Sequence, residues 1–161
     1  MKVVFLDRDG VINIERGEYT WKLDDFKFVE GLWKFLAIAQ NQGYQFIVIT
    51  NQGGIAKGLY SHGDLELVHQ KMRNEFDRHN IKLLDVFYSP YHDEVSKSLS
   101  RKPNSLMLEK AIALYRVNRI QSVMVGDSER DIIAANKVGI RGVLVKPNQN
   151  LLELKSRIID E

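Results

Sequence analysis

The fold is decided by residues 3–11, which read Val3-Val4-Phe5-Leu6-Asp7-Arg8-Asp9-Gly10-Val11. The run before Asp7 is apolar on both faces, which is typical of a strand buried in a parallel sheet. Two carboxylates directly after such a strand are costly unless a cation or a reaction uses them. A carboxylate can attack phosphorus, and a second one nearby can transfer protons. Asp7 and Asp9 are therefore either a reactive pair or a solvated acidic turn, and this stretch alone leaves both interpretations open.

Similar apolar runs recur at residues 46–49, 86–88, 123–125 and 143–145, with helical patterns between them. Apolar residues at intervals of three and four predict helices. The stripes are Leu32, Phe35, Leu36 and Ala39; Leu65, Val68, Met72 and Phe76; and Leu108, Ile112 and Tyr115. Two further helices are expected over about residues 129–138 and 150–159.

Local signals predict where several of these helices begin and end. Gly43 suits a C-terminal cap, and Ser61 with Asp64 resembles a capping box. Pro103 suits the first turn of the third helix, so Lys102 is expected at a helix start.

Strands that alternate with helices predict an α/β fold, a doubly wound parallel sheet of about five strands. Residues 1–161 are expected to form a single domain, because the intervals between the runs leave no room for a large cap domain. The site is then open and is screened only by residues 15–21 and 91–100. In such sheets ligands bind beyond the carboxyl ends of the strands, so the residues after each run matter most.

The second and third strand ends carry groups that suit a phosphate. The second run ends in Thr50-Asn51-Gln52-Gly53-Gly54, where a hydroxyl, two amides and two glycines can cradle phosphate oxygens. After the third run comes Arg101-Lys102-Pro103, whose lysine at a helix start would supply a point charge for an anion. Taken singly, a polar strand-to-helix loop and a basic surface loop explain these residues as well.

The fourth run ends in Gly126-Asp127-Ser128-Glu129-Arg130-Asp131. Mg²⁺ prefers a few carboxylate oxygens and keeps several waters, so Asp7 and Asp127 are expected to share it. The alternative is helix capping by Asp127 or Ser128, and capping and metal binding can coexist. All four signals fall at successive strand ends, which meet at one edge of a parallel sheet. Phosphoryl transfer needs this set of groups: a nucleophile, an acid/base, a metal and positive charge on the transferring oxygens.

The four motifs, in this order, resemble the haloacid dehalogenase (HAD) superfamily over nearly the whole chain. The resemblance is closer to the D-glycero-D-manno-heptose-1,7-bisphosphate phosphatases and their relatives, the histidinol-phosphate phosphatases. It is carried by residues 6–13, by Thr50-Asn51-Gln52-Gly53-Gly54-Ile55-Ala56-Lys57-Gly58 and by Arg101-Lys102-Pro103.

The resemblance implies a role for each matching residue. Asp7 is the nucleophile that forms an aspartyl-phosphate and a Mg²⁺ ligand, and Asp9 is the acid/base and binds the metal through its carbonyl. Asp127 completes the metal site. The remaining roles fall on Thr50 and Lys102, which hold the phosphate, on Asp131, which orients Lys102, and on Asn51, Gln52 and Arg101, which reach the rest of the substrate. The substrate implied is a heptose bisphosphate that loses its C7 phosphate.

One departure from the family concerns zinc. Such relatives commonly hold a structural zinc with three cysteines and one histidine before the Arg-Lys-Pro motif. Alignment on Tyr88 and Arg101 places Ser89, Tyr91, Ser98 and Ser100 at those positions, and the chain has no cysteine. His92 alone is no zinc site, so we expect no zinc. A second difference is Ser128, where some relatives have lysine.

Composition argues against two kinds of partner. The net charge of +2 comes from interleaved acidic and basic residues, which argues against nucleic acid or an anionic membrane as partner. No leader or membrane-spanning run is recognisable, so a cytoplasmic monomer acting on a small phosphate ester is expected.

Other functions stay open at this point. Histidinol-phosphate phosphatase and polynucleotide 3′-phosphatase activities are alternatives within the superfamily. A receiver-type phosphoacceptor domain is an alternative of another class, but its accepting aspartate should follow a middle strand, and here the third run leads to Ser89-Pro90. Neither the substrate nor its anomer follows from the sequence.

Overall fold

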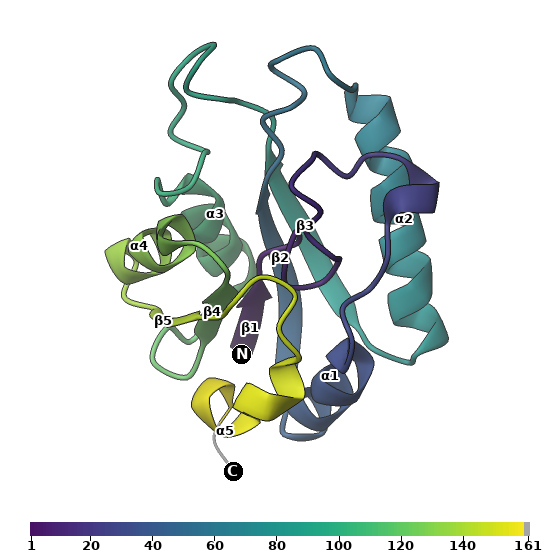
Figure 1. Ribbon diagram of the computed structural model, residues 1–161. Helices are drawn as coiled ribbons and strands as arrows, with labels where there is room; N and C mark the ends of the chain where they lie inside the picture. The colour runs from purple at the N-terminus through teal and green to yellow at the C-terminus, as the bar shows by residue number, and fades with distance from the viewer. Residues whose placement is uncertain (160–161) are drawn as a thin grey trace.

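The computed structural model describes residues 1–159, and its centre is one sheet of five parallel strands (Figure 1). The strands are β1 (Lys2–Leu6), β2 (Tyr44–Asn51), β3 (Leu83–Ser89), β4 (Val123–Gly126) and β5 (Arg141–Leu144), in the spatial order β3-β2-β1-β4-β5. The predicted α/β fold is therefore confirmed. Because β1 lies in the middle, between β2 and β4, Asp7 follows the central strand.

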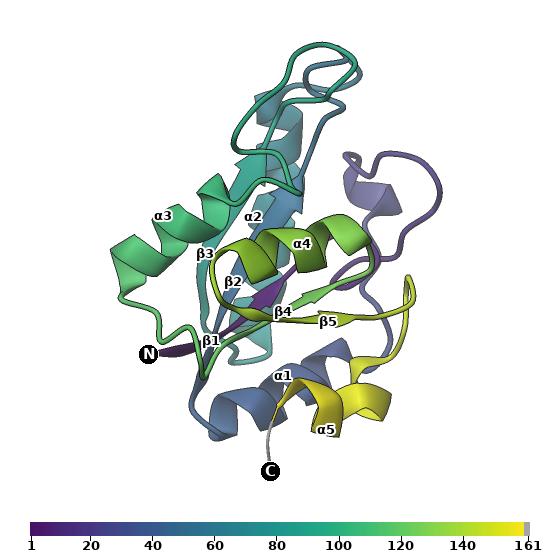
Figure 2. The ribbon, with the colours of Figure 1, turned by 90° about the vertical axis from the view of Figure 1, so that its left-hand side faces the viewer.

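Helices cover both faces of the sheet (Figures 1 and 2). One face carries α1 (Leu32–Asn41), α2 (His62–Arg78) and the C-terminal segment, which is η2 (Leu151–Leu154) followed by α5 (Lys155–Ile158). The other face carries α3 (Leu106–Tyr115) and α4 (Glu129–Lys137). Two apolar cores result, one on each side of the sheet.

The central strand explains why both faces must be covered. Val4 and Leu6 enter the core under α1 and α2, whereas Val3 and Phe5 enter the core under α3 and α4. All four side chains are fully buried. Burial of such side chains contributes about 1.5–3 kcal/mol each, so β1 is anchored from both sides and its C-terminal end is held in place.

Two predicted helix boundaries are wrong. The third helix begins at Leu106, not around Pro103, and residues 101–104 form turns. A side-chain clamp prevents an earlier start: Asn51 Oδ1 accepts from the Lys102 N–H, and Asn51 Nδ2 donates to the Lys102 carbonyl, both at 3.0 Å. The last predicted helix, residues 150–159, is a 3₁₀ turn followed by four α-helical residues.

Two predicted helix caps are confirmed. Ser61 and Asp64 form a complete capping box at the start of α2, as the sequence predicts. Gly43 has a φ of +88° just beyond α1, the conformation that a C-terminal glycine supplies.

The carboxyl edge of the sheet carries loops and no large cap. Two segments stand above it: residues 7–31, which contain the short η1 (Leu23–Asp25), and residues 90–105 (Figure 2). No helix among residues 1–159 is long and apolar enough to cross a membrane.

Candidate active site

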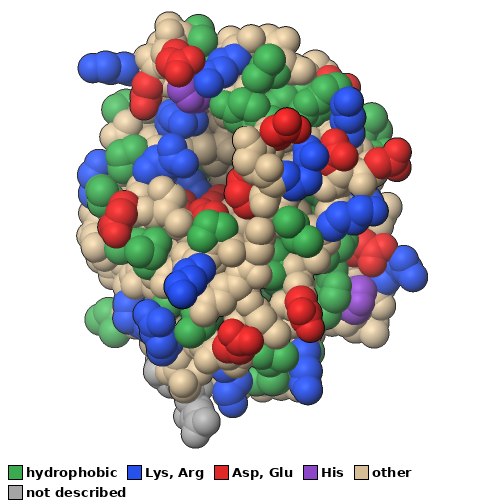
Figure 3. All heavy atoms as spheres, viewed as in Figure 1, with side chains coloured by type: hydrophobic (Ala, Val, Ile, Leu, Met, Phe, Trp, Pro, Cys, Tyr) green, Lys and Arg blue, Asp and Glu red, His purple; other side chains and the backbone are tan. Residues whose placement is uncertain are grey.

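A cavity of about 490 Å³ opens at the carboxyl edge of the sheet. The segments after β1, β2, β3 and β4 all contribute to its wall, which includes Asp7, Asp9, Asn51, Lys102, Asp127 and Asp131. Figure 3 shows the hollow on this face, with basic side chains along one side and acidic side chains at its floor. The topology therefore brings the four predicted strand ends to one place.

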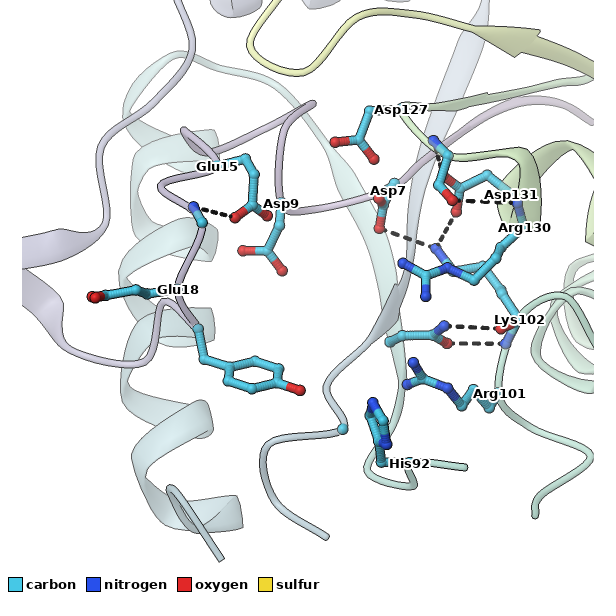
Figure 4. Close-up of a pocket in the computed structure, with 15 residues that line it drawn as sticks. Asp7, Asp9, Glu15, Glu18, His92, Arg101, Lys102, Asp127, Arg130 and Asp131 are labelled. Atoms are coloured by element: carbon cyan, nitrogen blue, oxygen red, sulfur yellow. Dashed lines mark hydrogen bonds and ion pairs between the residues drawn. The ribbon is translucent and has the colours of Figure 1, made fainter. Parts of the chain in front are cut away.

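The centre of the cavity is a buried ion-paired cluster. Lys102 Nζ lies 3.0 Å from Asp7 Oδ1 and 2.6 Å from Asp131 Oδ1 (Figure 4). It also donates to the Ile49 carbonyl at 2.6 Å. Burial favours the neutral amine, but Asp7 and Asp131 outweigh it and raise the pKa of Lys102. The lysine is therefore a fixed positive charge beside Asp7.

Asp131 also belongs to α4. Its Oδ2 accepts from the Ser128 N–H at 3.1 Å and completes a capping box in which Ser128 Oγ accepts from the Arg130 N–H. The same carboxylate thus starts the helix and holds Lys102, which is the contact that its predicted orienting role requires.

Three carboxylates in the cavity suit a divalent cation. One oxygen each from Asp7, Asp127 and Asp131 lies within 4.8 Å of the others. Burial, with Asp131 as the largest neighbouring cause, raises the pKa of Asp7, and burial with Asp131 also raises the pKa of Asp127. A cation would relieve this repulsion, and hard oxygen donors of this kind fit Mg²⁺.

Two glycines make room for this acidic cluster. A Cβ on Gly10, whose φ is +84°, would collide with the Asp127 carboxylate, and a Cβ on Gly126 would collide with Asp131. The space beside these carboxylates therefore depends on residues without side chains.

The Asp9 carboxylate lies outside the cluster of Asp7, Asp127 and Asp131. Its Oδ1 accepts from Arg8 Nη2 at 2.8 Å and Asn13 Nδ2 at 3.0 Å, and its Oδ2 accepts from Gln52 Nε2 at 3.0 Å. Burial opposes ionisation, but these donors outweigh it and lower the pKa of Asp9. Without substrate, Asp9 is therefore a carboxylate, and metal binding through its backbone carbonyl stays a prediction.

The predicted substrate-binding residues fall into two groups. Asn51, Arg101 and Lys102 line the cavity. Thr50 and Gln52 are buried behind the wall and are bonded to each other, Nε2 to Oγ1 at 2.9 Å. The remaining amide oxygen of Gln52 accepts from the Tyr60 hydroxyl at 2.6 Å, so the side chain is committed within the protein and orients Asp9.

Sequence reasoning missed several residues that build this site. Arg8 is fully buried, and besides Asp9 it binds the Thr20 carbonyl at 2.8 Å and contacts His69 at 3.3 Å. The one available signal was a charged residue placed between two acids after a buried strand. The others missed were Asn13, Tyr60 and Arg130, which no pattern singled out.

A serine network stands at the positions aligned with zinc ligands. Ser100 Oγ lies 2.8 Å from both Ser89 Oγ and Ser98 Oγ, and Ser98 Oγ also accepts from the Ser100 N–H. Nearby, the Tyr91 carbonyl accepts from Arg101 Nη1 at 3.0 Å. Hydroxyl hydrogen bonds therefore hold the loop that leads into Arg101 and Lys102.

Comparison with known proteins shows the family of this chain. A HAD-hydrolase-like family model matches residues 99–154. The curated relatives include a D-glycero-beta-D-manno-heptose-1,7-bisphosphate 7-phosphatase of Haemophilus ducreyi, 38% identical over 87% of this chain and 80% of its own length. Another is the alpha-anomer enzyme of Photorhabdus laumondii, 40% identical over 91% of this chain and 83% of its own length.

The structural comparison leads to the same group. A crystal structure of D,D-heptose 1.7-bisphosphate phosphatase from B. bronchiseptica, complexed with magnesium and phosphate, matches with a TM-score of 0.85 and 28% identity over 96% of this chain and 87% of that one. The fold and the aspartate–lysine site thus define a HAD-type hydrolase, and the enzyme is a phosphatase. Specifically, the chain belongs to the HAD phosphatase family, and within it resembles the heptose-1,7-bisphosphate 7-phosphatases.

Proposed function

We propose that this phosphatase removes the C7 phosphate of D-glycero-D-manno-heptose 1,7-bisphosphate, with Mg²⁺, through an aspartyl-phosphate on Asp7. The observation that carries the proposal is the contact of Asp7 with Lys102, beside the carboxylates of Asp127 and Asp131. The substrate is proposed from the names of the relatives, which include both anomers.

In the first step, an Asp7 oxygen attacks phosphorus in line and the bond to the sugar oxygen breaks. Asp9 donates its proton to that oxygen. Since Asp9 is a carboxylate without substrate, it must take up a proton as the substrate binds. A phosphate dianion beside Asp9 raises the pKa of Asp9, so that it takes this proton from solvent, whereas a monoanionic ester can supply the proton itself. Lys102 offsets charge on the transferring oxygens.

In the second step, Asp9 is again a carboxylate and takes a proton from a water molecule that attacks the phosphorus. The Asp7–phosphate bond breaks and inorganic phosphate leaves. The three hydrogen bonds to Asp9 favour this ionised form. When bound, Mg²⁺ would be held by Asp7, Asp127 and the Asp9 carbonyl and would offset phosphoryl charge.

A substrate panel tests the proposal. Phosphate release is measured, with Mg²⁺ and with excess EDTA, from both anomers of heptose 1,7-bisphosphate, from histidinol phosphate and from a DNA 3′-phosphate. We expect the highest kcat/KM with a heptose bisphosphate, the C1 phosphate retained in the product and no turnover in EDTA. A higher kcat/KM with histidinol phosphate or the DNA end would contradict the substrate, and full activity in EDTA would contradict the metal.

A further inference from the structure

Arg130 is an exposed arginine that lines the cavity. Its backbone N–H donates to Ser128 Oγ. Among residues 1–159, its guanidinium has no hydrogen bond or ion pair. Figure 4 shows Arg130 and Arg101 reaching from different segments toward the middle of the cavity. Arg130 also lies in the first turn of α4, where a positive charge opposes the helix dipole. Its placement therefore does not serve the helix.

Arg101 adds a second incompletely paired charge to the same wall. Its ion-pair partner, Asp93, is 3.9 Å away and 69% exposed. Burial, and after it the nearby Arg130, lowers the pKa of Arg101. Two neighbouring guanidinium groups that repel each other on one wall of a cavity are stabilised by an anion placed between them.

The reacting centre does not supply that anion. Lys102 pairs with Asp7 and Asp131, and a divalent cation held by this cluster would balance the remaining negative charge of Asp7, Asp127 and Asp131. Arg101 and Arg130 take no part in this charge balance, and they lie on the same side of the cavity (Figure 4). A substrate with one phosphate would occupy the reacting centre and leave them uncompensated.

We propose that Arg130, together with Arg101, binds a second, non-reacting phosphate of the substrate, and that Arg130 thereby determines selectivity for bisphosphates. This inference rests on the proposed function and assigns a specificity-determining residue to it. Ser128 carries no charge, so Arg130 is the residue in the first turn of α4 that presents a positive charge to this wall.

The test compares paired substrates in Arg130→Gln. For each enzyme, kcat/KM is measured with heptose 1,7-bisphosphate and with heptose 7-phosphate, and the ratio gives the bisphosphate preference. Loss of a charge-assisted contact should lower this ratio on the order of 10- to 100-fold. Arg130→Lys should restore part of it, because the charge returns without the planar fork. Arg119→Gln, an exposed arginine outside the cavity, is the matched control.

A second pair of probes separates this inference from the identity of the sugar. The inhibition constants of fructose 1,6-bisphosphate and fructose 6-phosphate are measured against p-nitrophenyl phosphate hydrolysis. If the wild type ignores heptose bisphosphates but binds the hexose bisphosphate more tightly than the monophosphate, and Arg130→Gln removes that difference, the proposed substrate fails and the role of Arg130 stands.

Three results would overturn the role of Arg130. The variant could keep the wild-type bisphosphate preference with both pairs. It could lose activity equally with mono- and bisphosphates, which would place Arg130 on the transferring phosphate. The wild type itself could show no preference for a second phosphate in either pair.

Discussion

At the scale of single residues, the protonation of Asp9, the proposed acid/base, depends on the donors that surround its carboxylate. Arg8, Asn13 and Gln52 all donate to Asp9, and they lower its pKa against the effect of burial. The site without substrate is thus prepared for the step that needs Asp9 as a base. Protonation for the first step depends on the incoming phosphate.

Gln52→Leu should therefore move the pH dependence of turnover. Removal of a donor to the Asp9 carboxylate raises the pKa of Asp9, so the acidic limb of kcat should shift to higher pH. With p-nitrophenyl phosphate, a good leaving group makes the base-dependent step dominant, and kcat is measured across this limb. Gln70→Leu, an exposed glutamine of α2, is the control. An unmoved limb would contradict the positioning role of Gln52.

The meeting of the proposed reactive residues could be predicted from sequence, whereas the residues that support them could not. Asp7, Lys102 and Asp127 follow β1, β3 and β4, so chain order and the parallel sheet were enough to predict a shared edge. Gln52 has the same amide chemistry whether it binds substrate or Asp9, and only the packing of Tyr60 against it distinguishes the two. Arg8 depends on partners at Thr20 and His69 that a local pattern does not specify.

At the scale of elements, the loop after β3 decides how Arg101 and Lys102 meet the cavity. Sequence reasoning placed Lys102 at a helix start, because Pro103 suits a first turn. The long-range clamp from Asn51 instead fixes the Lys102 backbone and delays α3 to Leu106. A side chain 51 residues away thus overrides the local signal.

The serine network of this loop gives a prediction about stability and zinc. Ser100→Ala removes both hydroxyl contacts and leaves the buried Ser89 without this partner, so the free energy of unfolding should fall by about 1–3 kcal/mol. KM should rise, because Arg101 follows directly. Urea unfolding and steady-state kinetics measure the two effects, with Ser96→Ala, an exposed serine of the same loop, as control.

Elemental analysis of the purified protein completes this test. We expect zinc well below one atom per chain, since the aligned positions carry three serines and a tyrosine. One zinc per chain in protein purified without added metal would contradict this expectation, and a Ser100→Ala variant as stable as the wild type would contradict the role of the network.

At the scale of the whole molecule, one histidine of α2, His69, connects this helix to Arg8 at the carboxyl edge of the sheet. His69 of α2 is buried and contacts Arg8, and burial together with Arg8 and Arg73 lowers the pKa of His69 to about 3. The ring is therefore neutral in the folded protein, and it accepts a hydrogen bond from the guanidinium.

This histidine makes stability depend on pH in a known direction. In the unfolded chain a histidine takes up a proton below about pH 6.5, whereas folded His69 stays neutral down to about pH 3. Between these values the unfolded state binds more protons, so the free energy of unfolding falls as pH falls, by up to about 1.4 kcal/mol per pH unit from this group.

His69→Gln should flatten that dependence. Urea unfolding at several pH values between about 7.5 and 4.5 is compared for the variant and the wild type. The exposed His62, changed to Gln, should leave the wild-type slope intact. The same slope in His69→Gln and the wild type would show that His69 does not stay neutral in the fold.

The proposed mechanism depends on Asp7 carrying the phosphoryl group. Asp9→Asn should slow hydrolysis of the phosphoenzyme by about 10²–10⁴-fold, so the intermediate should accumulate with p-nitrophenyl phosphate and Mg²⁺. Borohydride reduction converts an aspartyl-phosphate to homoserine, which mass spectrometry locates in the sequence. We predict homoserine at position 7, and none there in the Asp7→Asn/Asp9→Asn double variant. A stoichiometric burst of p-nitrophenol with the modification at another residue, or with residue 7 unchanged, would contradict the account.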